Sequence, residues 1–158
     1  MTTPNTAHAT AVQTQPVRAP RPAVRRVLAG SIGAAAAGAV VVLGYGALAI
    51  AVHGPMQAGD IGASEAAPIN AASFAIGVVF SSFFAILIAL AIGRWAARPG
   101  RTFQRTAIAL TVVSLAAPLG ASHTDEVTRL LLAGGHVVAA LVVIPLIVRA
   151  LRTTPTGS

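Results

Sequence analysis

The sequence lacks cysteine and lysine and has few acidic or aromatic residues: four Asp and Glu together, one tryptophan and one tyrosine among 158 residues. Without cysteine, disulfide bonds, thiolate metal sites and cysteine nucleophiles are excluded. Charged residues make up 9% of the chain, against about 25% in an ordinary soluble domain. The chain therefore lacks the polar surface that a water-soluble globular protein needs, and that class is excluded.

What the sequence has instead is four long apolar runs, of which the first two carry no charge, with 55% hydrophobic residues in the whole chain and a mean hydropathy of +0.77. About twenty apolar residues are enough for a helix to cross a bilayer. The runs cover residues 27–52, 69–92, 103–121 and 127–148. We therefore predict an all-α fold, an integral membrane four-helix bundle, with one transmembrane domain over residues 27–150.

The two ends of the chain differ from these runs. Residues 1–26 are rich in Thr, Pro, Ala and Arg and have too few large apolar side chains to form a core, so we predict a disordered cytoplasmic tail there. A second short tail is predicted over residues 151–158. A signal peptide is less favoured than an uncleaved first span, because its apolar region is typically about 7–15 residues long.

All eleven basic residues are arginine, and ten of them fall on one side of the predicted bundle, whereas all four acidic residues and Arg129 fall on the other. The positive-inside rule places the arginine-rich side in the cytoplasm, so we predict that both termini are cytoplasmic. The topology-determining arginines beside the spans are Arg25, Arg26, Arg94, Arg98, Arg101, Arg105, Arg149 and Arg152.

The bilayer itself is the partner that these arginines indicate, because anionic lipid attracts basic residues near its surface. We expect no nucleic-acid binding, since no docking element or exposed aromatic residues are interleaved with the charges. Arginine without lysine, alongside abundant alanine, valine and glycine, is typical of a GC-rich bacterial genome. The predicted location is therefore the bacterial cytoplasmic (inner) membrane, which the chain crosses several times.

Small residues recur at every fourth position of the first span, at Gly30, Ala34 and Gly38. In lipid, such stripes allow two helix backbones to approach closely. We predict that this face packs against another helix, which belongs either to the same chain or to a partner. A homo-oligomer and a complex with another membrane protein both remain open.

His136 is the one ionisable side chain deep within the predicted spans, and such a group is a functional hypothesis by default. The alternative is a structural imidazole, hydrogen-bonded to a serine, a threonine, Tyr45 or a backbone carbonyl in a gap left by Gly134 and Gly135. Haem ligation by two imidazoles would need a second deep histidine, so we predict no cofactor.

Polar residues outside the spans suggest little chemistry. Their spacing matches no metal motif, so we expect no metal site; the residues concerned are His53, Asp60, Glu65, His123, Asp125 and Glu126. Ser122 or Thr124 is expected to cap the fourth helix, with the two adjacent acids in its positive first turn.

Two stretches carry a resemblance to a known family: SLAAPLGAS (Ser114–Ser122) and TRLLLAGGHVVAALVVIPLIVRALR (Thr128–Arg152). Together they resemble an actinobacterial family of small four-span membrane proteins, DUF6069, over about residues 27–150. Matched by motif, the family positions are Pro118, Thr128, His136 and Pro145. The resemblance implies an integral inner-membrane protein and brings no activity with it.

From these observations we expect a non-enzymatic structural or accessory component of the membrane. The alternative is a small transporter or channel with a path near His136. A membrane enzyme is less favoured, because no nucleophile or acid–base pair is visible in the spans. Polar side chains from three helices facing one interior would favour transport, whereas a packed apolar bundle would favour the accessory role.

Overall fold

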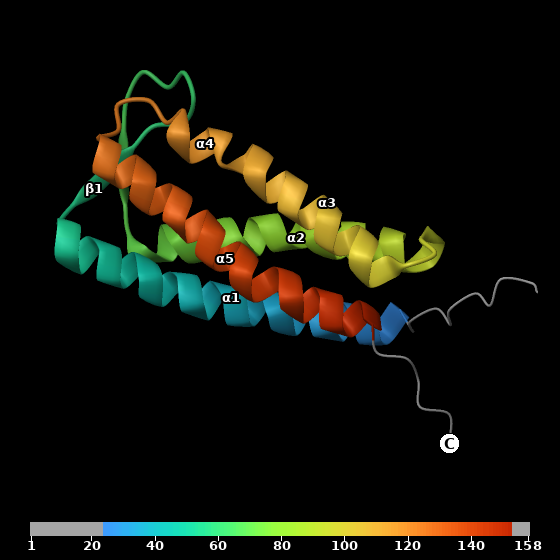
Figure 1. Cartoon of the computed structure of the whole chain (residues 1–158). Helices are drawn as coiled ribbons and strands as arrows, with labels where there is room; N and C mark the ends of the chain where they lie inside the picture. Colours follow the sequence, from blue (N-terminus) through green and yellow to red (C-terminus); the bar gives the residue numbers. More distant parts are fainter. Residues whose placement is uncertain (1–23, 153–158) are drawn as a thin grey trace, which may run out of the picture.

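The computed structural model describes residues 24–152, which form a bundle of long helices joined by short connections (Figure 1). In chain order the helices are α1 (Val24–His53), α2 (Ala71–Trp95), α3 (Pro99–Ser114), α4 (Ala116–Leu119) and α5 (Glu126–Arg152). Four segments, with α3 and α4 counted together, are long and apolar enough to cross a membrane. The predicted all-α four-span architecture is thereby confirmed.

The helix ends lie within a few residues of the predicted runs. α1 begins at Val24, so Arg25 and Arg26 belong to a helix rather than to the predicted tail, and α5 continues to Arg152. The remainder of the two predicted tails, residues 1–23 and 153–158, lies outside the described part of the chain.

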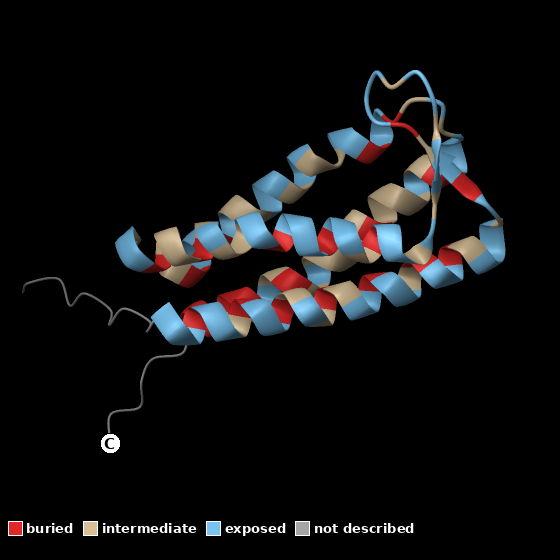
Figure 2. Cartoon of the chain, turned by 180° about the vertical axis from the view of Figure 1, so that it is seen from behind, coloured by how far each residue is buried: buried red, intermediate tan, exposed pale blue. Residues whose placement is uncertain are grey.

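The helices pack mainly through α1, which lies along α2 and α5, while α5 also contacts α3. The buried residues form stripes that face this common interior, whereas the outward faces are exposed (Figure 2). Those outward faces are apolar: Val40, Phe80 and Leu141 are 70%, 67% and 71% exposed. An apolar exterior around a packed interior suits a bundle surrounded by lipid.

Pro118 explains the division of the third span into two helices. Proline has no N–H, and its ring clashes with the carbonyl group four residues earlier, which here belongs to Ser114. α3 ends at Ser114, and the short α4 follows from Ala116 with Pro118 buried within it. Pro145, by contrast, lies exposed inside α5, and that helix continues past it.

The connection between α1 and α2 contains a short antiparallel hairpin of β1 (Met56–Ala58) and β2 (Ala67–Ile69), which the sequence did not predict. Gly59 joins the hairpin to Ser122 in the α4–α5 connection through N–H···O bonds of 2.9 and 3.1 Å. A Cβ atom at Gly59 would lie 2.7 Å from the Glu65 carbonyl oxygen. Glycine is therefore required where these two connections meet.

The two ends of the bundle differ in charge. The start of α1, the α2–α3 connection and the end of α5 lie at the same end (Figure 1). We name this the arginine end, because it carries eight exposed arginines: Arg25, Arg26, Arg94, Arg98, Arg101, Arg105, Arg149 and Arg152. The opposite, acidic end comprises the hairpin, the α4–α5 connection and the first turn of α5, with all four acidic residues of the chain and Arg129.

Candidate functional site

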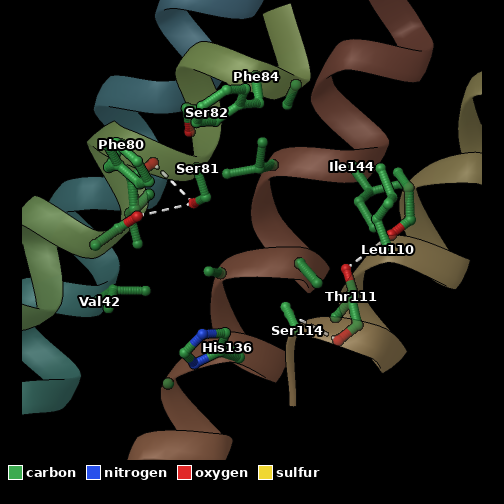
Figure 3. Close-up of a pocket in the computed structure, with 18 of the residues that line it drawn as sticks. Val42, Phe80, Ser81, Ser82, Phe84, Leu110, Thr111, Ser114, His136 and Ile144 are labelled. Atoms are coloured by element: carbon green, nitrogen blue, oxygen red, sulfur yellow. Dashed lines mark hydrogen bonds between the residues drawn. The ribbon is translucent and has the colours of Figure 1, made fainter. Parts of the chain in front are cut away.

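A cavity of about 580 Å³ lies between α2, α3 and α5, and we name it the cleft. Its volume falls within the range of about 300–1,000 Å³ that is usual for ligand sites. Phe80 of α2 and Leu110 and Val113 of α3 line it and are 67%, 48% and 68% exposed, so the cleft opens on the apolar flank of the bundle. Side chains from all three helices surround this space (Figure 3).

The cleft arises from how α3 is held at its two ends. At the arginine end, Gly100 lets α3 approach α5 closely, since a Cβ atom there would lie 2.8 Å from the Arg152 side chain. Phe103, which is buried, packs into the bundle one turn further along. Toward the acidic end, α3 and α4 diverge from α2 (Figures 1 and 2). The space between α2 and α3 therefore widens away from the arginine end.

Three of the five hydroxyl groups that line the cleft are bonded within their own helices. Ser81 Oγ of α2 donates to the Gly77 carbonyl at 2.9 Å. On α3, Thr111 Oγ1 donates to the Ala107 carbonyl and Ser114 Oγ to the Thr111 carbonyl, both at 2.8 Å. Such bonds to the preceding turn satisfy a hydroxyl without water. These bonds leave the cleft largely apolar, although five of its lining residues carry a hydroxyl group: Ser73, Ser81, Ser82, Thr111 and Ser114.

His136 lines the cleft from α5, half-buried, and its Nδ1 lies 3.0 Å from the Leu132 carbonyl oxygen. A carbonyl oxygen can only accept, so Nδ1 carries the proton in this arrangement and Nε2 of the neutral ring is the acceptor. The hydrogen bond to a backbone carbonyl is among those predicted for a structural imidazole. His136 shares the cleft with Ser81, Thr111 and Ser114, as Figure 3 shows.

The predicted gap for His136 beside Gly134 and Gly135 is wrong, because two aromatic side chains fill it. A Cβ atom at Gly134 would overlap the Tyr45 hydroxyl, and one at Gly135 would lie 3.1 Å from the Phe74 ring. The Tyr45 hydroxyl donates to the Leu131 carbonyl at 2.9 Å. The glycine pair therefore admits the aromatic residues of α1 and α2 against α5 and leaves the imidazole to the cleft.

The small-residue stripe of α1 packs against α5 of the same chain. A Cβ atom at Gly30 would lie 2.6 Å from that of Ala150, and one at Gly38 would lie 2.5 Å from Val143 Cγ2. Ala34, between the two glycines, is 1% exposed. The sequence left open whether this face packs against a helix of the same chain or of a partner; in the structure it packs against α5 of the same chain.

The cap of α5 is Asp125, so the expectation of Ser122 or Thr124 is wrong. Asp125 Oδ1 accepts from the Thr128 N–H at 2.9 Å, which is the geometry of an N-cap residue. Ser122 and Thr124 are engaged elsewhere: Ser122 Oγ accepts from the Gly62 N–H, and Thr124 Oγ1 donates to the Ser122 carbonyl. Asp125 directly precedes Glu126, the first residue of α5, so its carboxylate reaches the backbone N–H of the third helical residue, Thr128.

Thr128 connects this cap to α1. Its buried Oγ1 donates to Asp125 Oδ2 at 2.5 Å and lies 3.4 Å from His53 Nε2. The side-chain hydrogen bond from Thr128, followed by the one from its backbone N–H, lowers the pKa of Asp125 below its ordinary value. His53 Nε2 lies 3.6 Å from Asp125 Oδ1. The end of α1 and the start of α5 are therefore linked through a small polar cluster.

The four family positions thus fall in different places. Pro118 and Thr128 lie near the acidic end, His136 lines the cleft, and Pro145 is exposed further along α5. Among residues 24–152, no three His, Asp or Glu side chains gather where they could hold a metal ion. The cleft residues Phe80, Phe84 and Leu110 were missed in the sequence, because apolar residues within apolar spans give no distinguishing signal.

These features define a small multi-pass membrane protein with a cleft between α2, α3 and α5. The model of a family of unknown function, DUF6069, matches residues 18–153, and the chain belongs to this family. The match includes Arg18 and Arg21, which lie before the region of motif resemblance. No curated protein and no solved structure matches the chain.

Proposed function

We propose that this protein is a non-enzymatic accessory component of the bacterial cytoplasmic membrane that binds an apolar, membrane-embedded partner in the cleft. The observation that carries the proposal is an open, largely apolar cleft on the flank of the bundle, in which three of the five hydroxyls bond to their own helices. In lipid, association depends on van der Waals packing rather than on expulsion of water. A concave apolar surface supplies that packing, and side chains already bonded to backbone suit contact rather than catalysis.

The arginine end is assigned to the cytoplasm in this proposal. Eight exposed arginines at one end and all the acids at the other support this orientation under the positive-inside rule. The lack of lysine and the abundance of alanine support a GC-rich, actinobacterial source.

Cysteine labelling tests the orientation, because the natural chain has no cysteine. In Asp60→Cys and Arg101→Cys, both changed positions are exposed and lie at opposite ends of the bundle. An impermeant thiol reagent applied to intact cells is expected to label the first variant and spare the second, and both should react after the membrane is opened. The reverse pattern in intact cells would place the arginine end outside.

Proton-linked transport is the second candidate, and it is favoured by the meeting of His136 with hydroxyls of α2 and α3 in one cleft. His136→Gln separates the candidates, because an amide keeps a donor and an acceptor and cannot cycle a proton. In vesicles with an imposed potential and a trapped pH dye, the accessory proposal expects the same proton leak from wild type, from the glutamine variant and from protein-free vesicles.

A wild-type proton flux that disappears in a well-folded His136→Gln protein would overturn the accessory proposal. His136→Leu serves as the second comparison, since it removes the bond to the Leu132 carbonyl. It is expected to lower the melting temperature in detergent modestly, by the cost of about 1 kcal/mol for one hydrogen bond. Loss of stability in the leucine variant alone would mark the imidazole as a packing element.

A further inference from the structure

We propose that the cleft holds an acyl chain of an anionic phospholipid from the cytoplasmic leaflet, whose phosphate is bound by the arginines at the junction of α2 and α3. This inference rests on the proposed function and names the partner that occupies the cleft. It combines two features of the same region, an apolar cavity and an uncompensated positive charge.

The apolar half of the site lies in the part of the cleft nearest the arginine end. Phe84 and Ile88 of α2 face Phe103 and Leu110 of α3 across it, and Ile144 of α5 completes the lining. Phe84 and Leu110 are each 48% exposed, so a chain can enter sideways from the surrounding lipid. The lining is almost entirely hydrocarbon, which an acyl chain matches without any polar group left unpaired.

The charged half of the site lies where those two walls are joined, from the last turn of α2 through the connection to the first turns of α3. Arg94, Arg98, Arg101 and Arg105 fall within residues 94–105, and all are exposed. The one ion pair within residues 24–152 is His53–Asp125 at the acidic end, so no carboxylate of the described chain neutralises these arginines. Guanidinium groups bind phosphate oxygens well, because several N–H donors point the same way.

The depth of these groups fits one lipid molecule. Trp95, the last residue of α2, is 78% exposed at the same junction, and tryptophan favours the level of the lipid headgroups. Phe103, at the inner limit of the cleft, lies between Arg101 and Arg105 in sequence. A lipid with its phosphate at the level of Trp95 therefore has its chains at the level of Phe84 and Leu110, where the flank of the bundle is open.

Brominated lipids provide the test, because bromine on an acyl chain quenches tryptophan fluorescence at contact and the chain has one tryptophan. The cleft reporter is Phe84→Trp combined with Trp95→Phe. Its matched control is Val40→Trp combined with Trp95→Phe, since Val40 is exposed near the middle of α1 and does not line the cleft. Both proteins are placed in phosphatidylcholine vesicles with a small fraction of phosphatidylglycerol.

The two preparations carry the same fraction of brominated lipid, either phosphatidylglycerol or phosphatidylcholine. We expect brominated phosphatidylglycerol to quench the reporter at position 84 several-fold more strongly than brominated phosphatidylcholine does. The reporter at position 40 should show no such preference. In the triple variant Arg98→Gln, Arg101→Gln, Arg105→Gln this several-fold preference should disappear, because each arginine near the surface is worth about fivefold in affinity for an anionic headgroup. Arg25→Gln, Arg26→Gln removes charge from the same end on α1 and should keep the preference.

Equal quenching at position 84 by both headgroups would overturn the anionic-lipid assignment. If that quenching were still stronger than at position 40, the cleft would hold an apolar occupant, as the proposed function requires. Quenching at position 84 no stronger than at position 40, together with covalent capture of a second copy or another membrane protein from the cleft, would also overturn it and would identify a protein occupant. The proposed function itself would fail in a different way: quenching at position 84 would match that at position 40, and no protein would be captured from the cleft.

Discussion

Replacing Gly38 with leucine is expected to lower the melting temperature in detergent by several degrees, a loss of about 1–3 kcal/mol typical of overpacked cores. A Cβ atom at this position would lie 2.5 Å from Val143 Cγ2 and 3.3 Å from Val78 Cγ1. Both valines are buried, at 8% and 4% exposure. Both valines also line the cleft, so the longer side chain fits only by displacing them into it or by forcing α1 away from α5 and α2, and either change disrupts the packed interior.

Gly33→Leu is the matched control on the same helix. Gly33 is exposed, and a Cβ atom there would meet nothing within 4 Å. Leucine is a better helix former than glycine by up to about 1 kcal/mol, so the melting temperature should stay the same or rise. Equal losses in both variants would show a general intolerance of leucine in α1, and an unchanged melting temperature in Gly38→Leu would show that the Gly30, Ala34, Gly38 face is not packed.

Much of this fold follows from the sequence, because crossing a membrane imposes strong demands on composition. A spanning helix needs an uncharged apolar run, and the runs at residues 27–52 and 69–92 became α1 and α2 with ends shifted by only a few residues. Close packing of the Gly30 to Gly38 stripe was predicted for the same reason, since small residues are what let helices approach in lipid. The partner of that stripe required the structure.

The candidate site was much less predictable. Phe84 in the cleft and Phe83 on the outer surface are neighbours in an apolar run, and their different surroundings depend on how α2 is rotated against α3. Gly134 suggested room for His136. A glycine indicates only that some group packs close to the backbone, and here that group is the Tyr45 hydroxyl. The sequence cannot say which of several aromatic residues reaches such a gap.

The N-cap of α5 shows a related limit at shorter range. Ser122, Thr124 and Asp125 are all good cap residues, so residue type alone cannot choose among them. The choice depends on which backbone position begins the helix, and sequence patterns locate helix ends only to within a few residues. The hairpin that engages Ser122 was also unexpected, because strands of three residues leave no clear alternation to detect.

The central claim, that the cleft binds a particular membrane component, is tested most directly by photo-crosslinking in native membranes. A photoreactive residue replaces Phe84 in the cleft or Val40 on the outer face of α1, and the products are identified by mass. We expect position 84 to give a discrete adduct, lipid or protein, that is enriched many-fold over its share of the membrane, while position 40 gives products in proportion to bulk lipid. Identical products in bulk proportion from both positions would contradict the account, because the cleft would then be ordinary lipid-facing surface.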